Sequence, residues 1–457
     1  MTALAFPAAP ATPARHTLSW GLNIFIWLLP FHVLAIAVLF GVMGLPAGAV
    51  RAIAAWKELL VAALLLLALL RVASGRGPRG GVAWPDLAVA GLGLVALTYL
   101  AGAQAWFASD LPAPLQLLGW RDAVFVTLLY FVGRASPGTA HDGRPLRALI
   151  VIGIVTSGIA IVERLLVTPD MLVILGAASF IQDFLGLAVT TTHNPYGLPD
   201  SYFSVIGGRL VQRAGSTYLS SQGFAIPFLL IIPAATLGLL RLEHRRVWAW
   251  LGYTVLWAGL LLTLARMTIV ACVAQVILLT ALCRRWSGAV GGALVAVLAL
   301  IVALFAIPGF ATFAWETLTW ETGSSVSHLE DWSEGVAYLV EHPFGVGLGA
   351  GGLTAARFGL PPVAADSQYF KYSVELGVVG LALYAAALVG VAAAGIHVFR
   401  SAATEPARAW GALAVASTLG LAWNGLTTVP LATPVFAYVF FWLAGTTVTL
   451  ANLERTP

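Results

Sequence analysis

Long stretches without a single Asp, Glu, Lys or Arg residue most constrain how this chain can fold. A helix needs about 20 mainly apolar residues to cross the hydrocarbon core of a bilayer. The uncharged stretches that reach or exceed this length are 16–50, 87–109, 214–240, 286–315, 376–399 and 409–453. The chain is 60% apolar and only 10% charged, whereas soluble domains carry about 25% charged residues, so a water-soluble globule is excluded. We therefore predict an all-α, polytopic integral membrane protein.

The number of spanning helices follows from these stretches and from weaker apolar segments between them. The stretch 409–453 is too long for one helix, and Pro430 and Pro434 near its middle predict a turn between two helices. The weaker candidate spans are 51–71, which carries Lys57 and Glu58, 121–134, 147–166, 247–265 and 267–283. The total is about twelve. Charges inside a span are functional candidates, although the adjacent pair Lys57-Glu58 fits an interfacial position better than a relay.

Positive charges predict the orientation of the chain in the membrane. Fifteen of the 24 basic residues fall in alternate loops counted from the N-terminus. They are Arg15, Arg71, Arg76, Arg79, Arg134, Arg144, Arg147, Arg241, Arg245, Arg246, Arg284, Arg285, Arg400, Arg408 and Arg455. Because cytoplasmic loops are enriched in Lys and Arg, both termini are predicted to be cytoplasmic. No cleavage site follows the first span, which favours an uncleaved signal anchor.

The chain accordingly divides into six segments, two of them long loops on the outer face. The segments are a cytoplasmic tail at 1–19, transmembrane helices 1–5 at 20–166, a first long loop at 167–221, transmembrane helices 6–9 at 222–308, a second long loop at 309–373, and transmembrane helices 10–12 with a short cytoplasmic tail at 374–457. The two loops hold ten of the twenty acidic residues. Long loops gathered on one face indicate that this is the working face.

Several kinds of site are excluded by what the motifs lack. Cys272 and Cys283 lie in one apolar stretch, and the histidines show no metal-ligand spacing, so we predict no metal or other cofactor. The glycine-rich run at 345–352 has no Gly-Lys-Ser/Thr and is either a turn that lets backbone approach a substrate or simple loop punctuation. The net charge of +4 comes without basic runs, which excludes nucleic acid as a partner.

Three outer-face residues are the candidates for chemistry: Arg213, Arg266 and Asp366. An arginine presents a planar fork of donors that suits phosphate oxygens, and a carboxylate can take a proton from a hydroxyl nucleophile. Two arginines and one base are what transfer from a lipid diphosphate requires. Each residue also has a simpler interpretation: Arg213 as a solvated loop residue, Arg266 as a helix-end anchor, and Asp366 with Ser367 as a helix N-cap.

The residues resemble the O-antigen ligase and O-antigen polymerase group of bacterial envelope glycosyltransferases. The resemblance rests on the segment Arg213-Ala-Gly-Ser-Thr, on the turn at Arg266, and on His342-Pro-Phe-Gly-Val-Gly-Leu-Gly349. It continues through Asp366-Ser-Gln-Tyr and Glu375-Leu-Gly-Val-Val-Gly380. The number of spans and the large loop after the ninth span agree as well, so the likeness covers most of the chain.

The resemblance implies a GT-C-like fold in the bacterial inner membrane, with the two long loops in the periplasm. It implies a metal-independent, inverting transfer of an oligosaccharide from undecaprenyl diphosphate to a sugar hydroxyl. Arg213 and Arg266 would hold the diphosphate, and Asp366 would be the general base. The additional substrate-binding candidates are His342, Gly347, Gly349, Tyr369 and Lys371. Membrane lipids and a chain-length regulator are the other partners implied.

The choice between polymerase and ligase depends on position 366. Ligases of this group usually carry His-Asn where this chain has Asp366-Ser367. His328 and His342 could substitute only if the second long loop folds back. An acidic residue is more similar to polymerases, so we favour a polysaccharide polymerase. A ligase that transfers the glycan to lipid A-core or to a protein stays open, as does a transporter or flippase of lipid-linked oligosaccharide; a purely structural scaffold is the weakest interpretation.

Overall fold

The computed structural model describes residues 18–75, 81–102, 111–187, 194–241, 247–284, 309–319, 323–361, 363 and 366–454. Within these residues the chain is mostly helical, with a single two-stranded antiparallel hairpin formed by β1 (Phe203–Ile206) and β2 (Arg209–Gln212). The predicted all-α membrane class is confirmed at this level.

Seven described helical segments are long and apolar enough to cross a membrane. Joined across short breaks, they are α1–η3 (Ser19–Val42), α2–α3 (Ala47–Ala73), α5–α6 (Ala113–Arg134), α7 (Arg144–Leu166), α10–α11 (Ser221–Leu240), α18 (Gln368–Ser401) and α20 (Pro434–Leu453). Three shorter apolar helices are α4 (Trp84–Leu100), α12 (Val247–Leu262) and α13 (Arg266–Leu282). Another helix, α19 (Glu405–Asn424), is largely buried in the bundle.

The total of twelve spans stays a prediction. Most of the predicted span 286–315 and of the N-terminal tail 1–19 lies outside the described residues. The stretch 409–453 does divide as expected: α19 ends at Asn424, the short turn η10 (Pro430–Ala432) follows, and α20 begins at Pro434. The two prolines predict this break correctly because each suits the start of a helical turn and neither fits a helix interior.

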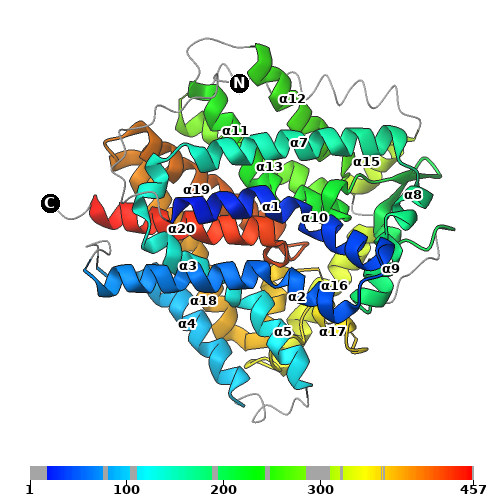
Figure 1. Ribbon diagram of the computed structural model, residues 1–457, viewed down its shortest axis with the longest axis horizontal. Coiled ribbons are helices and arrows are strands. Elements are labelled where there is room, and N and C mark those ends of the chain that lie inside the picture. The colour runs from blue at the N-terminus through cyan, green and yellow to red at the C-terminus, as the bar shows by residue number, and fades with distance from the viewer. Residues whose placement is uncertain are drawn as a thin grey trace.

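The helices form a bundle along the longest axis of the molecule, in which α1, α3, α7 and α20 run lengthwise (Figure 1). α20 is the most enclosed of the candidate spans, with 94% of its apolar window buried. Its backbone lies directly against α6 (Leu128–Arg134), because a Cβ added to Gly445 or Gly133 would collide with the carbonyl oxygens of Tyr130 and Trp442. Glycine at these two positions therefore allows α20 and α6 to pack backbone against backbone.

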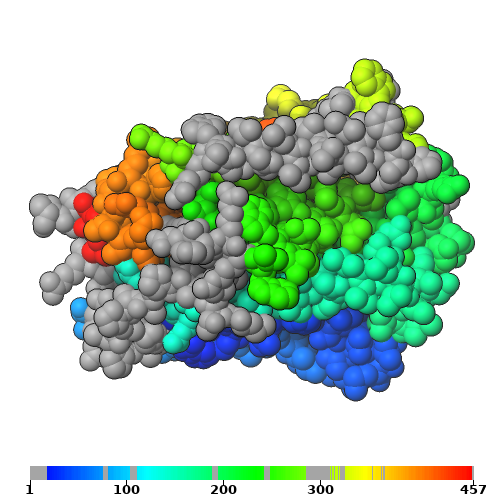
Figure 2. Space-filling model, turned by 90° about the horizontal axis from the view of Figure 1, so that it is seen from above, coloured from blue at the N-terminus to red at the C-terminus, as the bar shows by residue number. Residues whose placement is uncertain are grey.

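The outside of the bundle is apolar, as lipid contact requires. Leu59, Leu165 and Trp248 leave 69%, 73% and 78% of their surface exposed, all on helices. Figure 2 shows the molecule from above, with the orange residues of the α19 region at one end and the blue-green residues of the first long loop at the other. Large exposed apolar side chains over whole helix faces would be a liability in water but match a hydrocarbon environment.

The short elements gather at the end of the bundle opposite the C-terminus (Figure 1). In the first long loop they are α8 (Pro169–Ile174), α9 (Ala177–Ser179), η7 (Phe180–Phe184), η8 (Asp200–Tyr202), the β-hairpin and η9 (Ser216–Tyr218). In the second they are α15 (Phe310–Leu318), α16 (Gly323–Glu341) and α17 (Leu353–Ala356). The short turns η5 (Phe125–Thr127) and η6 (Pro137–His141) complete the described elements. The described parts of both long loops thus lie at one end of the bundle.

Candidate active site

Arg213 follows the β-hairpin and points at the turn between α12 and α13. Its Nε donates to the carbonyl oxygen of Thr263 at 2.8 Å, and its Nη1 donates to that of Ser201 at 3.2 Å. The backbone N–H of Ala214 donates to the carbonyl oxygen of Leu262 at 3.0 Å. These bonds fix the guanidinium against the beginning of α13, which is not the geometry of a loop residue surrounded by water.

The residues after Arg213 are anchored by a buried carboxylate. Glu163, near the end of α7, accepts the backbone N–H groups of Gly215 at 3.2 Å and Ser216 at 2.5 Å. The hydroxyl of Thr217 donates to the carbonyl oxygen of Pro30 in α1 at 2.6 Å. Because a buried carboxylate needs several donors, Glu163 and this segment hold each other in place and so position Arg213.

Arg266 is the first residue of α13, directly after a tight turn. Leu264 in that turn has a φ of 52°, in the left-handed region, and the hydroxyl of Thr263 accepts the N–H of Ala265 at 3.1 Å. Burial and the nearby charge of Arg266 lower the pKa of the Arg213 guanidinium to about 10. Two cations held this close repel each other, and an anion bound between them would relieve the repulsion.

The second long loop folds back so that His328 of α16 meets Asp366. His328 Nδ1 lies 4.0 Å from Asp366 Oδ2, and Asp331, one helical turn along α16, has a carboxylate oxygen within 4.8 Å of both groups. We call His328, Asp331 and Asp366 the acid–base cluster. The charge of Arg266 acts on His328, so the cluster adjoins the arginine pair formed by Arg213 and Arg266. The second long loop therefore folds back in the way that His328 would need in order to substitute for the His-Asn pair of the ligases.

The environment sets the protonation states of the acid–base cluster. Burial raises the pKa of Asp366, and burial together with the negative charge of Asp366 raises that of Asp331. Burial and the positive charge of Arg266 lower the pKa of His328 against the opposing charge of Asp331. The imidazole is therefore neutral at neutral pH, and the carboxylates are stronger bases than ordinary aspartates. The Asp366 side chain remains 41% exposed, so an acceptor can reach it.

Among the described residues, the acid–base cluster is the group of side chains that could offer three ligand atoms to a metal ion. The positive charge of Arg266 acts on His328 of this cluster, and a positive charge there disfavours the binding of a divalent cation. Metal independence therefore stays our prediction for this site.

Ser367, rather than Asp366, caps α18. Its side chain accepts the N–H of Phe370 at 3.4 Å and donates to the carbonyl oxygen of Gly425 at 3.1 Å. The cap of this helix does not use the Asp366 carboxylate, which lies instead beside His328 and Asp331.

The glycine loop, residues 345–352, is packed against a kink in α18. Gly377 at the kink has a φ of 65°, and the carbonyl groups released there accept from the loop: Val374 from the N–H of Val346 at 2.8 Å and Glu375 from that of Gly347 at 3.2 Å. Gly347 and Gly349 have φ values of 113° and 87°, which other residues rarely adopt. The glycine loop is therefore held against α18 by backbone hydrogen bonds at the kink.

Three other candidate residues have defined partners. Lys371 and Glu375 form a buried ion pair in α18 (2.6 Å, side chains 3% and 0% exposed), and Lys371 Nζ also donates to the carbonyl oxygen of Gly351 at 3.2 Å. The Tyr369 hydroxyl donates to the carbonyl oxygen of Ala422 at 2.8 Å. The ring of His342 lies 4.7 Å from that of Tyr338. Of these contacts, the bond from Lys371 to Gly351 joins α18 to the glycine loop, and that from Tyr369 to Ala422 joins α18 to α19. Substrate binding by these residues stays a prediction.

Replacing Lys371 by Met should destabilise the protein by about 3–5 kcal/mol, because it leaves the carboxylate of Glu375 buried without its counter-ion. Thermal unfolding of the detergent-purified protein measures the loss. The double variant Lys371→Met/Glu375→Leu should recover most of the stability, since it removes both buried charges. A single variant as stable as the wild type would contradict a structural role for the ion pair.

The sequence did not single out Asp331 and Glu163. Asp331 lies three residues after His328, a spacing that places both on one face of a helix, and this spacing could have flagged the pair. Glu163 is a lone acid at the end of an apolar span, which marks it as a functional candidate. Its partners, however, lie more than 50 positions away and follow no local pattern.

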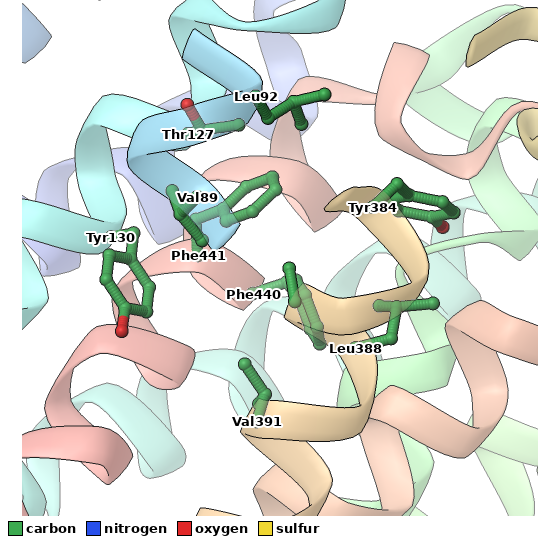
Figure 3. A pocket seen from close by; sticks show the side chains of 10 residues that line it. Val89, Leu92, Thr127, Tyr130, Tyr384, Leu388, Val391, Phe440 and Phe441 are labelled. Atoms are coloured by element: carbon green, nitrogen blue, oxygen red, sulfur yellow. The ribbon is translucent and has the colours of Figure 1, made fainter. Parts of the chain in front are cut away.

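A small pocket lies elsewhere, between α4, α6, α18 and α20 (Figure 3). Apolar side chains dominate its lining, including Val89, Leu92, Leu388 and Phe440. None of the arginines or carboxylates described above lines it. This pocket is a packing feature of the bundle interior and not a candidate for the site.

The fold and the site define a class: a multi-pass membrane protein with cationic and acid–base side chains at one end of its bundle. Residues 251–385 match the family model described as O-antigen ligase, which confirms the resemblance seen in the sequence for this part of the chain. The match begins in α12, includes Arg266, the acid–base cluster and the glycine loop, and ends in α18. Arg213 precedes it. No curated protein matches the chain.

This match supports an O-antigen ligase/polymerase-type membrane glycosyltransferase, a family that implies lipid-linked oligosaccharide as the class of substrate. Together with the apolar helices it indicates a multi-pass protein of the inner membrane.

Proposed function

We propose that the protein is a polysaccharide polymerase that moves a growing chain from undecaprenyl diphosphate to the terminal sugar of a second lipid-linked repeat unit, at the periplasmic face. The observation that carries this proposal is the meeting of the arginine pair and the acid–base cluster at one end of the bundle. The loops that supply them are far apart in the sequence, and they are joined here through the interaction of Arg266 with His328.

The chemistry requires a cation at the leaving group and a base at the acceptor. The arginine pair binds the diphosphate and stabilises the charge that develops as the glycosidic oxygen departs. Asp366 accepts the proton of the attacking hydroxyl, with neutral His328 beside it. Direct attack inverts the anomeric centre and needs no metal, because the guanidinium groups neutralise the diphosphate.

The acid at position 366 favours polymerase over ligase. Of the groups in the acid–base cluster, Asp366 is the one at the position where the resemblance places the ligase histidine. A transporter is disfavoured because these groups lie at one end of the bundle, whereas transporter sites lie near the midplane.

The purified protein, incubated with lipid-linked repeat units, tests the function. A polymerase gives a ladder of chain lengths, and the ladder should persist in excess EDTA. A single transfer to added lipid A-core without a ladder would favour the ligase. Movement of the lipid-linked sugar across vesicles with no new glycosidic bond would show a transporter.

The rate of transfer should fall on the acid side as Asp366 becomes protonated, at a pH above the usual range of an aspartate, because its pKa is raised. Asp331→Asn should leave this acid limb in place, because burial raises the pKa of Asp366, whereas the repulsion between the two carboxylates raises the pKa of Asp331. Measuring kcat/KM from about pH 4 to pH 8 for both proteins checks this. An acid limb that moves to lower pH in Asp331→Asn would contradict burial as the cause of the raised pKa of Asp366.

A further inference from the structure

A second group of charges lies on the helices beside the glycine loop. Lys57 pairs with Glu58 at 3.0 Å on the first turn of α3 (Trp56–Ala73). Arg121 pairs with Asp122 at 2.8 Å near the end of α5 (Ala113–Ala123). α5 lies against the glycine loop, since a Cβ on Gly119 would collide with the backbone of Gly349.

Arg121 lies where its spanning segment is interrupted. α5 ends at Ala123, Val124 leaves helical geometry with φ −122° and ψ −39°, and η5 follows before α6. The Arg121 side chain is 40% exposed although it lies within a membrane-length segment. Charged side chains in spans almost always face the protein interior or a water-filled space, so we infer that the exposed part of Arg121 faces water or a ligand.

Arg357 adds a cation that lacks a counter-ion within the described residues. It follows α17, and its Nε is buried without a hydrogen-bond partner in the part of the chain that the structure describes. α17 packs against α5, which carries Arg121 and Asp122. Burial and the charge of Arg121 lower the pKa of Arg357, whereas the charge of Asp122 raises it. With the pairs Lys57–Glu58 and Arg121–Asp122 neutral, Arg357 leaves one net positive charge. A largely buried cation is costly unless an anion pairs with it.

This group is separate from the arginine pair. The charges that act on Arg357 are those of Asp122 and Arg121, whereas Arg213 responds to Arg266. Figure 1 shows α5 and α17 in the lower half of the view and α12 and α13 in the upper half.

We propose that Arg357 and Arg121 bind the diphosphate of a second polyprenyl-linked saccharide, the acceptor of the polymerisation. The inference rests on the proposed function, because a polymerase joins two substrates that each carry a lipid diphosphate, whereas a ligase takes only its donor in this form. Two separate cationic sites meet that requirement: the arginine pair holds the donor, and Arg357 with Arg121 holds the acceptor.

The number of diphosphate sites tests the proposal. Farnesyl diphosphate, a soluble polyprenyl diphosphate, is titrated against the full chain in phosphatidylcholine nanodiscs, and the bound ligands are counted by native mass spectrometry. Wild type should bind two. Arg357→Gln should weaken one site by about 10-fold to 100-fold, as expected for loss of a charged hydrogen-bond donor, and Arg357→Lys should weaken it less. Arg164→Ala, an exposed arginine on α7, should still bind two.

Three outcomes would overturn the proposal: one site in the wild type, two undiminished sites in Arg357→Gln, or loss of both sites together. A repeat in nanodiscs that contain phosphatidylglycerol tests the other source of phosphate. If that lipid displaces the diphosphate from the Arg357 site alone, the site holds a membrane phospholipid and not the acceptor. A wild type that binds two diphosphates but makes no ladder would refute the polymerase function and leave the second site standing.

Discussion

Asp366→Asn should reduce glycosyl transfer by about 10²-fold to 10⁴-fold, the range over which general bases contribute. Asparagine keeps the size of the side chain but cannot accept the proton of the attacking hydroxyl. Ser367 supplies the cap of α18, so the helix should form normally in the variant. Production of the saccharide ladder from lipid-linked repeat units, measured at matched protein amounts, gives the rate.

Two companion variants make this result specific to the base. Asp170→Asn changes an exposed acid at the start of α8, at the same end of the bundle, and should leave the rate unchanged. His328→Gln should lower the rate less than Asp366→Asn, because His328 acts beside the base in our mechanism. If Asp366→Asn polymerises normally while His328→Gln is inactive, the imidazole is the base and the assignment to Asp366 is wrong.

The membrane class and the main helices follow from the sequence because hydrophobicity over about 20 residues is a local signal. Pro430 and Pro434 locate the break between α19 and α20 for a similarly local reason. The break between α5 and α6 is harder to foresee, since no Pro or Gly marks Val124 and the local geometry depends on tertiary packing. The short helices α8 and α9 also lack a strong local pattern.

The site could be predicted only in part, for reasons of chemistry and distance. Arg213, Arg266 and Asp366 stand out because charges are rare in this chain. The position of His328 beside Asp366, 38 positions later in the chain, depends on how α16 folds back, which composition does not reveal. Lys371 illustrates the converse: a lysine before a span suggests a ligand for phosphate, but its i,i+4 partner Glu375 ties it to the glycine loop.

Arg266→Ala should reduce transfer by about 10²-fold to 10³-fold, the effect of removing a donor that stabilises charge in the transition state. Arg213→Ala should have an effect of similar size. Because both guanidinium groups bind one diphosphate, the double variant should be little worse than either single variant, since residues that act as a unit are not additive. Lysine at either position should restore only part of the rate, because an ammonium group lacks the planar fork of donors.

The control for the arginine pair is Arg209→Ala, four residues before Arg213 on the exposed part of β2, which should transfer at the wild-type rate. Diphosphate binding separates catalysis from folding: each Ala variant of the pair should lose the donor site and keep the site at Arg357. Arg213 is also held by the carbonyl groups of Thr263 and Ser201, so its loss could loosen the hairpin. Arg213→Lys keeps a donor there. If this variant and Arg266→Ala both transfer normally, the two arginines do not hold the leaving diphosphate, and the mechanism fails at its first step.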